Sequence, residues 1–283
     1  MRIAVIGAGM MGPGIALSLL KNGHQVSVKA HRNRAPIDDL VSRGAREATT
    51  TTAIAEADVI ILCVSTSEVV AETIADLTPH LRGGHIVIDC GTSAPAVTRD
   101  LAQLLATKGV AYADAPLTGG PDQAAKGELG VLCGAEAGTF SKIEPVLKGF
   151  ATTVRHFGPP GSGHTAKLIS NYLVTGMIAL VTEAFTAARR SDLDWRDLYE
   201  VMQNGSGNSG VLHKMMSGAF GGGFDGYRFS IANAAKDIGY YREVADRLEC
   251  GSDLTEAVAS VFSDAVKAGR GGQNVSRFLE NVT

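Results

Sequence analysis

The sequence has few cysteines and almost no excess of either charge. Only four of its 283 residues are cysteines, and none shows the C-x-x-C spacing of metal and redox sites. Cys63 and Cys90 stand in apolar, strand-like runs, which favours buried free thiols over disulfides or metal ligands, so no metal site is expected. The formal net charge of −3 gives no indication of a nucleic-acid or lipid partner.

A long uninterrupted apolar run is also lacking. The longest, residues 173–181, is too short to span a bilayer, and no internal repeat or low-complexity segment occurs. An apolar strand begins at residue 2, which leaves no room for a secretory signal. With 45% apolar residues, the chain is expected to be a globular protein of the cytoplasm with no membrane partner.

The most informative feature that is present lies at the start of the chain. A short apolar run, residues 2–6, leads into a glycine pattern, and a helix-prone stretch follows. Gly7 permits a tight turn, Gly9 lets the backbone approach a pyrophosphate, and Gly12 lets the helix pack close to the strand. A glycine-rich turn without a ligand is the alternative, which the strand–turn–helix context disfavours. The expected cofactor contacts in this loop are Gly7, Gly9, Met10, Met11 and Gly12.

The second β-type run, residues 25–29, ends in a basic segment. Domains that prefer NAD usually place Asp or Glu there to hold the ribose 2′-hydroxyl, and this chain has no carboxylate in that segment. Guanidinium groups instead match the geometry of a 2′-phosphate, so NADP is favoured over NAD, although a solvated basic loop is the alternative. The expected contacts are Arg32 first and Arg34 second, with Asn33 and His31 beside them.

The order of apolar runs predicts two domains. Up to about residue 160, short β-type runs alternate with helical stretches, the pattern of a doubly wound α/β sheet. The runs at 58–64 and 85–90 are nearly continuous in apolar residues, as in strands buried on both faces. A glycine and proline cluster at 158–163 ends this pattern, and a helix over 164–190 follows. We therefore expect a Rossmann domain over 1–162 and an all-α domain over 163–283.

Polar residues recur on one face of that long predicted helix. His164, Lys167, Asn171 and Thr175 are spaced by three, four and four residues, and their neighbours are mostly apolar. We therefore expect this stripe to face a cleft rather than bulk water. A partly desolvated Lys167 has a lowered pKa and suits proton transfer, whereas the alternative is a lysine that reaches the surface near a helix start.

A second candidate segment, residues 114–120, follows a predicted strand. Its Thr-Gly-Gly end offers a hydroxyl and unencumbered backbone N–H groups, a cradle for a carboxylate, and a plain turn is the alternative. Farther along, Phe229 precedes the pair Lys236 and Asp237 on a predicted helix. Such a pair is usually a solvated face or a structural salt bridge.

These segments together resemble the β-hydroxyacid dehydrogenase family, which includes 3-hydroxyisobutyrate dehydrogenase, tartronate semialdehyde reductase and glyoxylate and succinic semialdehyde reductases. The resemblance covers nearly the whole chain and implies a 6-phosphogluconate dehydrogenase-like architecture. The family's N-terminal motif matches residues 7–12, its D-x-P-x-S-G-G motif matches 114–120, and its G-x-G-x-x-x-K-x-x-x-N motif matches 161–171. The family's last motif matches Phe229, Lys236 and Asp237.

The resemblance implies a role for each matched residue. Lys167 would protonate the developing alkoxide during carbonyl reduction and act as the base in reverse, while Asn171 would hold the substrate and Lys167 in register. Thr118, Gly119 and Gly120 would bind the substrate carboxylate. The cofactor would supply the hydride. Its further implied contacts are Val64, Ser65, Thr92, Phe229 and Lys236.

Two departures from the family pattern stand out. Thr118 replaces the usual Ser and adds a methyl group to the carboxylate site, and the segment 30–34 is one residue longer than usual. The alternatives are an imine reductase, which shares the architecture but generally replaces the lysine, and a non-catalytic dinucleotide-binding module; Lys167 argues against both. The long apolar helix also predicts a homodimer or tetramer. The sequence does not identify which short hydroxy acid or semialdehyde is the substrate.

Overall fold

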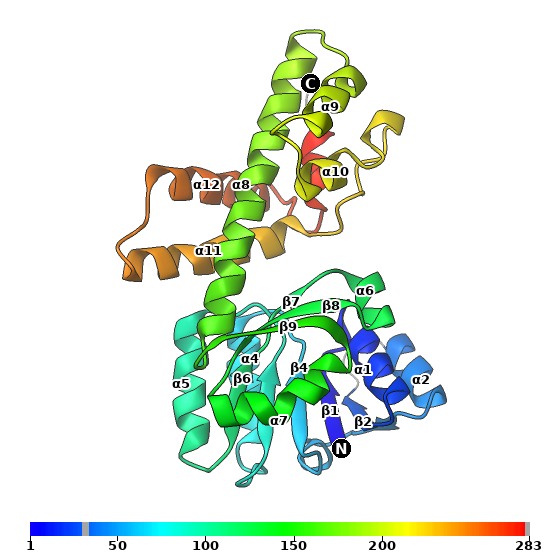
Figure 1. Cartoon of the computed structure of the whole chain (residues 1–283), viewed down its shortest axis with the longest axis vertical. Helices are drawn as coiled ribbons and strands as arrows, with labels where there is room; N and C mark the ends of the chain where they lie inside the picture. Colours follow the sequence, from blue (N-terminus) through cyan, green and yellow to red (C-terminus); the bar gives the residue numbers. More distant parts are fainter. Residues whose placement is uncertain (30–33, 281–283) are drawn as a thin grey trace. The chain divides into compact units, whose positions relative to one another are not determined.

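The computed structural model describes residues 1–29 and 34–280, and the chain forms two compact units, residues 1–167 and 168–283. Helix α8, Ser162–Arg190, begins in the first unit and continues into the second (Figure 1). The two compact units therefore divide within the first turns of α8, and the boundary expected near residue 162 lies at the start of the same helix. The reason is that the first turn of α8 packs on the first unit, where the backbone N–H of His164 donates to Asp114.

The first unit is built on a nine-stranded sheet in the order β3-β2-β1-β4-β5-β6-β8-β7, with β9 paired to β8. The strands from β3 to β6 are parallel, whereas β8 runs antiparallel to β6 and β7. The strands are β1 Arg2–Ile6, β2 Gln25–Lys29, β3 Arg46–Glu47, β4 Val59–Leu62, β5 Ile86–Asp89, β6 Ala111–Asp114, β7 Leu117–Thr118, β8 Leu129–Gly134 and β9 Ala151–Gly158.

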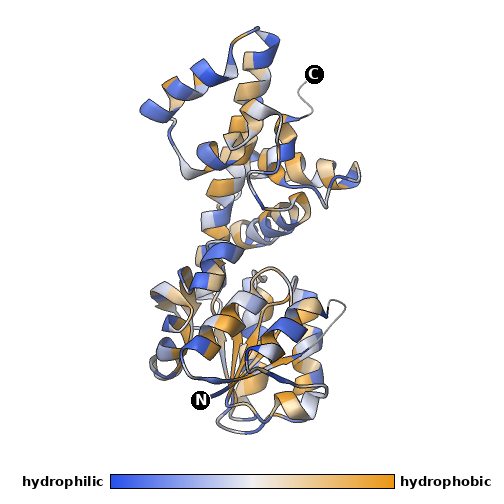
Figure 2. Cartoon of the chain, turned by 90° about the vertical axis from the view of Figure 1, so that its right-hand side faces the viewer, coloured by the Kyte–Doolittle hydropathy of each residue, from blue (hydrophilic) through white to orange (hydrophobic). Residues whose placement is uncertain are grey.

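Helices cover both faces of this sheet because its strands are apolar on both sides. Along β1, Ile3 and Val5 face one hydrophobic cluster, while Ala4 and Ile6 face the other. Figure 2 shows these strands as mostly hydrophobic. One face carries α1 Gly12–Lys21, α2 Ala35–Ser42, α6 Pro121–Lys126 and α7 Ala137–Lys148. The other carries α3 Thr51–Ile54, α4 Ser67–Leu77 and α5 Pro95–Ala106. The doubly wound sheet predicted from the sequence is confirmed.

The regular elements of the second unit are all helices among its described residues, apart from one isolated bridge between Ser230 and Asn274. Its core gathers around the fully buried Phe185 and Phe262. Its helices after α8 are α9 Trp195–Asn204, α10 Gly210–Met216, α11 Ile231–Arg247 and α12 Asp253–Lys267, with short 3₁₀ helices at Ala219–Gly221 and Val275–Leu279. The all-α character predicted after the glycine and proline cluster is therefore confirmed.

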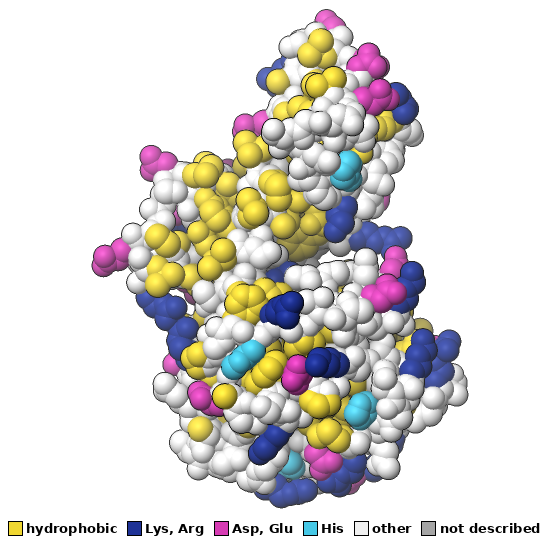
Figure 3. Space-filling model, viewed as in Figure 1, with side chains coloured by type: hydrophobic (Ala, Val, Ile, Leu, Met, Phe, Trp, Pro, Cys, Tyr) yellow, Lys and Arg dark blue, Asp and Glu magenta, His cyan; other side chains and the backbone are white. Residues whose placement is uncertain are grey.

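Helix α8 is more exposed than its composition predicts. Ile169, Leu173 and Leu180 are 52%, 64% and 65% exposed. Hydrophobic side chains gather over α8 and α12 on the face shown in Figure 3. By length and composition α8 could cross a membrane, and 28% of its most apolar window is buried, although a core helix of a soluble protein passes the same test. The uninterrupted run at 173–181 is thus only part of a longer apolar helix.

The cysteines are free thiols in the part of the chain that the structure describes. Cys90 is buried, as predicted, and Cys63 is half-buried. Burial raises the pKa of Cys133 to about 12, and a neighbouring thiol, that of Cys63, together with burial raises the pKa of Cys90. Only Cys250 is exposed.

Candidate functional site

The glycine loop after β1 leaves room for side chains at only one of its three glycines. Gly7 has a φ of +113°, and a Cβ there would overlap the carbonyl oxygen of Cys63. A Cβ at Gly12 would overlap the carbonyl oxygen of Gly7. Nothing lies within 4 Å of a Cβ built on Gly9, so this edge of the loop is open to a ligand. Met10 is 59% exposed beside it, and Met11 is half-buried.

Helix α1 begins without a side-chain cap. Its N-cap is Met11, no side chain among the described residues accepts from its first N–H groups, and its first turn holds no acidic residue. By contrast, the Thr66 hydroxyl caps α4 by accepting from the Val69 N–H at 3.4 Å. Uncapped N–H groups and the positive end of the helix dipole are suited to bind an anion. The geometry therefore fits a pyrophosphate at this turn.

The basic segment after β2 is described only in part. Ala30, His31, Arg32 and Asn33 lie outside the described residues, so their predicted cofactor contacts stay predictions. Arg34 is described, and its guanidinium donates to Glu47 on β3 at 2.7 Å and to Asp38 at 2.8 Å. These two carboxylates occupy the fork that was expected to reach a 2′-phosphate. Arg34 therefore fits the phosphate role less well than the sequence indicated.

Two further loops follow the carboxyl ends of the parallel strands β4 and β5, and these ends lie at one edge of the sheet. Val64 and Ser65 follow β4, and Thr92 follows β5, in the loop that leads into α5. Asp89, the last residue of β5, accepts from the N–H of Gly91 at 2.8 Å and from the Ser93 hydroxyl at 2.7 Å. The loop that carries Thr92 is therefore held by hydrogen bonds to a buried carboxylate at the end of β5.

The Thr118–Gly120 segment lies at the edge of the sheet. Thr118 is exposed and its hydroxyl lies over Gly130, where a Cβ would overlap it. Thr118 and Gly119 line a cavity of about 420 Å³ with Arg155. Gly120 differs from the expectation, because its N–H is not unencumbered: it donates to Oε1 of Gln123 at 2.9 Å. Gly120 is the N-cap residue of α6, and a capping interaction with Gln123 takes its N–H.

The polar stripe of α8 does not face a cleft as a whole. His164 and Thr175 are fully buried, so the expectation is wrong for these two residues. His164 packs inside the first unit, and the Thr175 hydroxyl donates back to the carbonyl of Asn171 at 2.9 Å. Lys167 is half-buried at the end of the first unit. Asn171 follows on the same helical face, because residues four apart lie one turn on.

In the second unit, Lys236 and Asp237 form a mostly buried ion pair, and the cofactor contact expected for Lys236 stays a prediction. The Asn171 side-chain amide donates from Nδ2 to Oδ2 of Asp237 at 2.6 Å, and Nζ of Lys236 lies 3.2 Å from Oδ1. The side chains of Lys236 and Asp237 are 17% and 5% exposed. Asp237 therefore fixes the orientation of the amide of Asn171. Phe229, the last predicted residue of this group, is half-buried beside Tyr227, with 6.1 Å between ring centroids.

Several residues that shape the site were missed from the sequence. Asp89 ends the buried strand β5, and a charged residue that ends an apolar run is a signal that sequence reasoning had available. Asp114, which ends β6, was named from the sequence as the first residue of the 114–120 segment but was given no role of its own. Glu47 carried no such signal, because it stands on β3, a strand of two residues. Arg155 carried none either, because only folding brings it to the cavity that Thr118 lines.

Comparison with known proteins agrees with this arrangement. Residues 2–158 match a family model described as the NAD binding domain of 6-phosphogluconate dehydrogenase, and residues 161–282 match one described as NAD-binding of NADP-dependent 3-hydroxyisobutyrate dehydrogenase. The chain is 31% identical to 3-hydroxyisobutyrate dehydrogenase of Pseudomonas aeruginosa, over 92% of this chain and 91% of that protein. It is 30% identical to 3-sulfolactaldehyde reductase of Escherichia coli, over 99% and 95%.

A solved structure of Mycobacterium tuberculosis 3-hydroxyisobutyrate dehydrogenase with L-serine has the same fold. Its TM-score is 0.88 at 26% identity, over 99% of this chain and 98% of that one. The matched segments include the glycine loop, the Asp114–Gly120 motif and the start of α8, whose geometry is given above. The chain therefore belongs to the β-hydroxyacid dehydrogenase family of oxidoreductases that use a nicotinamide dinucleotide.

Proposed function

We propose that this protein is an NADP-preferring oxidoreductase that interconverts a short β-hydroxy acid and its semialdehyde, with Lys167 as the general acid and base. The observation that carries the proposal is the half-buried Lys167, one turn before an Asn171 whose amide is fixed by Asp237. When bound, the dinucleotide supplies or accepts the hydride. The residues of the chain bind, orient and move the proton.

Lys167 has the chemistry that carbonyl reduction requires. Its ammonium donates a proton from Nζ to the carbonyl oxygen as that oxygen gains negative charge, and in oxidation the neutral amine accepts the proton back. Asn171 orients the reacting group through hydrogen bonds, and Asp237 keeps its amide from rotating. The lowered pKa of Lys167 expected from the sequence stays a prediction.

The substrate carboxylate has a candidate site at Thr118 and Gly119. The cavity of about 420 Å³ that they line is also lined by Arg155, whose guanidinium pairs well with a carboxylate, and by Glu128, whose charge opposes one. Gly120 does not offer its N–H to a ligand here, since this N–H donates to the side chain of Gln123. These features support a small acid as substrate. A relative in E. coli is named for 3-sulfolactaldehyde, so the assay panel should include an aldehyde that carries a sulfonate in place of the carboxylate.

Lys167→Ala tests the central assignment. We expect turnover to fall by about 10²–10⁴-fold, the usual contribution of a positioned general acid. Binding of the cofactor should change little, because Gly7, Gly9 and Gly12 lie in a separate loop after β1. Steady-state kcat on the best substrate of a panel of short semialdehydes and hydroxy acids, with cofactor titration by fluorescence, measures both quantities.

Lys167→Arg is the matched control, because it keeps the charge but holds its proton too tightly to transfer it. We expect it to remain as inactive as Lys167→Ala. A Lys167→Ala enzyme that keeps more than about a tenth of wild-type kcat contradicts the general-acid role. Lys236 is then the first alternative donor.

The preference for NADP rests on the missing carboxylate after β2 and on Arg32. We expect Arg32→Ala to lower kcat/KM with NADPH by roughly ten- to a hundredfold, as the loss of an exposed charge-assisted contact to phosphate allows. Arg34→Ala should have a smaller effect, since Glu47 and Asp38 already engage its guanidinium. Equal kcat/KM of the wild type with NADPH and NADH contradicts the preference.

Two alternatives remain distinguishable by experiment. An imine reductase of this fold generally lacks the lysine, so turnover of a cyclic imine that survives in Lys167→Ala would favour it. A non-catalytic module would bind NADPH without turnover of any member of the acid panel. The retained Lys167 argues against both.

We also propose that the protein is a homodimer or tetramer that buries the exposed side of α8. Leu173, Leu180 and Leu254 line a groove of about 280 Å³ between α8 and α12, and each is more than half exposed. Leu180→Glu should dissociate the assembly, whereas Leu104→Glu, at an exposed leucine of α5, should not. Sedimentation of a wild-type monomer at micromolar concentration contradicts the proposal.

A further inference from the structure

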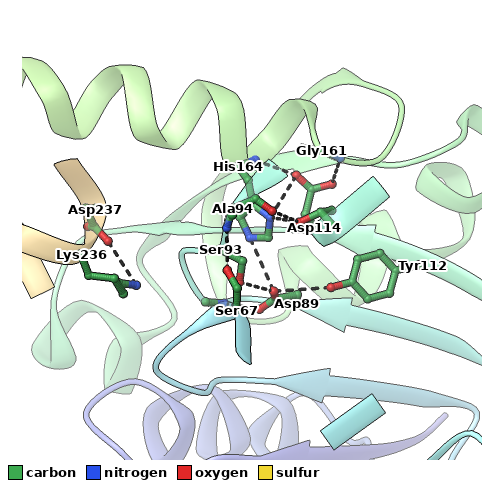
Figure 4. Close-up of polar contacts among 12 residues, drawn as sticks. Ser67, Asp89, Ser93, Ala94, Tyr112, Asp114, Gly161, His164, Lys236 and Asp237 are labelled. Atoms are coloured by element: carbon green, nitrogen blue, oxygen red, sulfur yellow. Dashed lines mark hydrogen bonds and ion pairs between the residues drawn. The ribbon is translucent and has the colours of Figure 1, made fainter. Parts of the chain in front are cut away.

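One buried histidine lies between two buried carboxylates in the first unit. The side chains of His164, Asp89 and Asp114 have no exposed surface. Nε2 of His164 lies 3.7 Å from Oδ2 of Asp89, and Nδ1 lies 3.7 Å from Oδ2 of Asp114 (Figure 4). Nδ1 also lies 2.8 Å from the hydroxyl of Thr98 on α5. The ring thus touches residues of three separate elements.

Asp114 anchors the start of α8. Its Oδ1 accepts from the N–H of Gly161 at 2.7 Å and its Oδ2 accepts from the N–H of His164 at 2.6 Å (Figure 4). Gly134 and Gly163 leave room for this carboxylate, since a Cβ on either would overlap it or press against it. The first turn of α8, which leads to Lys167, is therefore held by both oxygens of a single carboxylate.

Asp89 anchors the other segment, the loop from β5 to α5. Its Oδ1 accepts from Gly91 and its Oδ2 accepts from the Ser93 hydroxyl, and these bonds span Thr92. The loop is held a second time from α4, where the Ser67 hydroxyl accepts from the N–H of Ala94 at 2.7 Å. His164 is the side chain that lies between this loop anchor and the anchor of α8.

Stability alone does not account for this cluster. Burying ionisable groups is costly, and apolar side chains of similar volume are often at least as stabilising. Burial raises the pKa of the Asp114 carboxyl, an effect that the nearby His164 and the two amides oppose. His164 Nε2 has no hydrogen-bond partner among the described residues, although Asp89 lies 3.7 Å away. A costly, incompletely bonded cluster between two functional segments indicates a role in their placement.

We propose that His164 is a positioning residue that holds the loop of Thr92 and the first turn of α8 in fixed register, so that Lys167 is aligned with the nicotinamide end of the cofactor. The inference rests on the proposed function of Lys167. His164 acts through Lys167 and Thr92 and touches no substrate. Replacing the His164 side chain would therefore displace Lys167, the proton donor, while leaving that lysine in the chain.

His164→Leu is the direct test, measured on the full-length enzyme with saturating NADPH. We expect kcat to fall by about 10²-fold, the effect of a displacement of about 1 Å, while the Kd for NADPH changes less than about threefold. In the Lys167→Ala background the same change should lower kcat by less than about threefold, because residues that act as a unit are non-additive. A merely structural role would lower both backgrounds equally.

Two companion variants complete the design. Thr98→Val removes the hydroxyl that lies 2.8 Å from Nδ1 and 3.2 Å from the Ala94 carbonyl, and it should lower kcat in the same direction by a smaller factor. This variant carries the test if His164→Leu fails to fold. His85→Leu is the matched control, because His85 is also buried and its Nε2 has no hydrogen-bond partner in the part of the chain that is described. His85 nevertheless precedes β5 and so lies at the opposite end of that strand from Asp89. Its kcat should stay at the wild-type value.

The outcomes separate the two proposals. An active Lys167→Ala enzyme overturns both the proposed function and this inference. If Lys167→Ala is nearly inactive and His164→Leu is folded, then a harmless or fully additive His164→Leu overturns this inference alone. A kcat loss in His85→Leu as large as that in His164→Leu also overturns it.

Discussion

Removing Asp237 should destabilise the second unit and misorient Asn171. In the wild type, this carboxylate accepts from Nδ2 of Asn171 at 2.6 Å and lies 3.2 Å from Nζ of Lys236. Asp237→Ala therefore leaves the buried amide of Asn171 without this acceptor and removes a carboxylate that lies beside the mostly buried ammonium of Lys236. Breaking a buried pair costs about 3–5 kcal/mol, and a hydrogen bond to a charged group contributes about 1.5–3 kcal/mol.

The expected loss of unfolding free energy in Asp237→Ala lies at the lower end of the range of about 3–5 kcal/mol. Because the Lys236 side chain keeps 17% of its surface exposed, water recovers part of its solvation, and we expect the free energy of unfolding to fall by about 3 kcal/mol. Asp237→Asn keeps an acceptor for Asn171 and should lose less. Turnover should fall with both variants, more steeply for Asp237→Ala.

The single tryptophan of the chain provides the assay. Trp195 lies in α9 of the second unit and packs edge-on against Phe185, with ring centroids 5.3 Å apart, so its fluorescence in urea reports the unfolding of that unit. Asp225→Ala is the control. Asp225 also joins an asparagine amide and a cation, those of Asn274 and Arg277, but at an exposed site.

A surface pair contributes little to stability, so Asp225→Ala should shift the urea midpoint much less than Asp237→Ala. Equal shifts for the two variants would refute the reasoning that burial makes the Asp237 contacts strong. An unchanged kcat in Asp237→Ala would separately refute the role of Asp237 in orienting Asn171.

Three other predictions follow from local geometry. Gly12→Ala should lower the free energy of unfolding by about 1–3 kcal/mol, because the added Cβ overlaps the backbone. Gly9→Ala should show the wild-type unfolding curve in chemical denaturation but bind NADPH more weakly. Burial lowers the pKa of His85, so as the pH falls below about 6.5 this histidine takes up a proton in the unfolded chain before it does so in the folded one. The free energy of unfolding should therefore decrease from pH 7 to pH 5, and this decrease should be smaller in His85→Leu. Alkylation of the native protein at neutral pH should modify Cys250 first, and mass spectrometry showing rapid labelling of Cys133, whose pKa is raised to about 12, would contradict this.

The sequence predicted the elements that a continuous pattern encodes. The fully apolar runs that became β4 and β5, the glycine loop and the long helix α8 all have a local signature of composition and length. It did not predict β3 and β7, because strands of two residues are too short for a period to be seen. The reversed direction of β8 was also missed, since hydrophobicity does not encode the orientation of a strand.

For the site, the sequence predicted which residues take part but not the contacts that hold them. The residue types and their order along the chain indicated Lys167, Asn171 and the Thr118 segment. The contacts that hold them could not be read, because Asp237 bonds to an asparagine 66 residues away and Asp114 to an amide 50 residues away. Arg34 was assigned to a phosphate because Glu47, which engages it, stands on a strand that the pattern did not reveal.

Because α1 begins without a cap, we expect the bound cofactor to stabilise the folded state of this protein. A missing N-cap costs a helix about 0.5–2 kcal/mol, and a pyrophosphate bound at the turn would satisfy the same N–H groups. At a free cofactor concentration of about 100 times the Kd, binding adds about 2.7 kcal/mol to the stability of the folded state. We therefore expect the half-life under limited proteolysis to lengthen with added NADPH in the wild type and much less in Gly9→Ala. Inside a cell, the abundance of the enzyme would then follow the size of the dinucleotide pool, so the supply of cofactor would set how much catalyst survives as well as how fast it works.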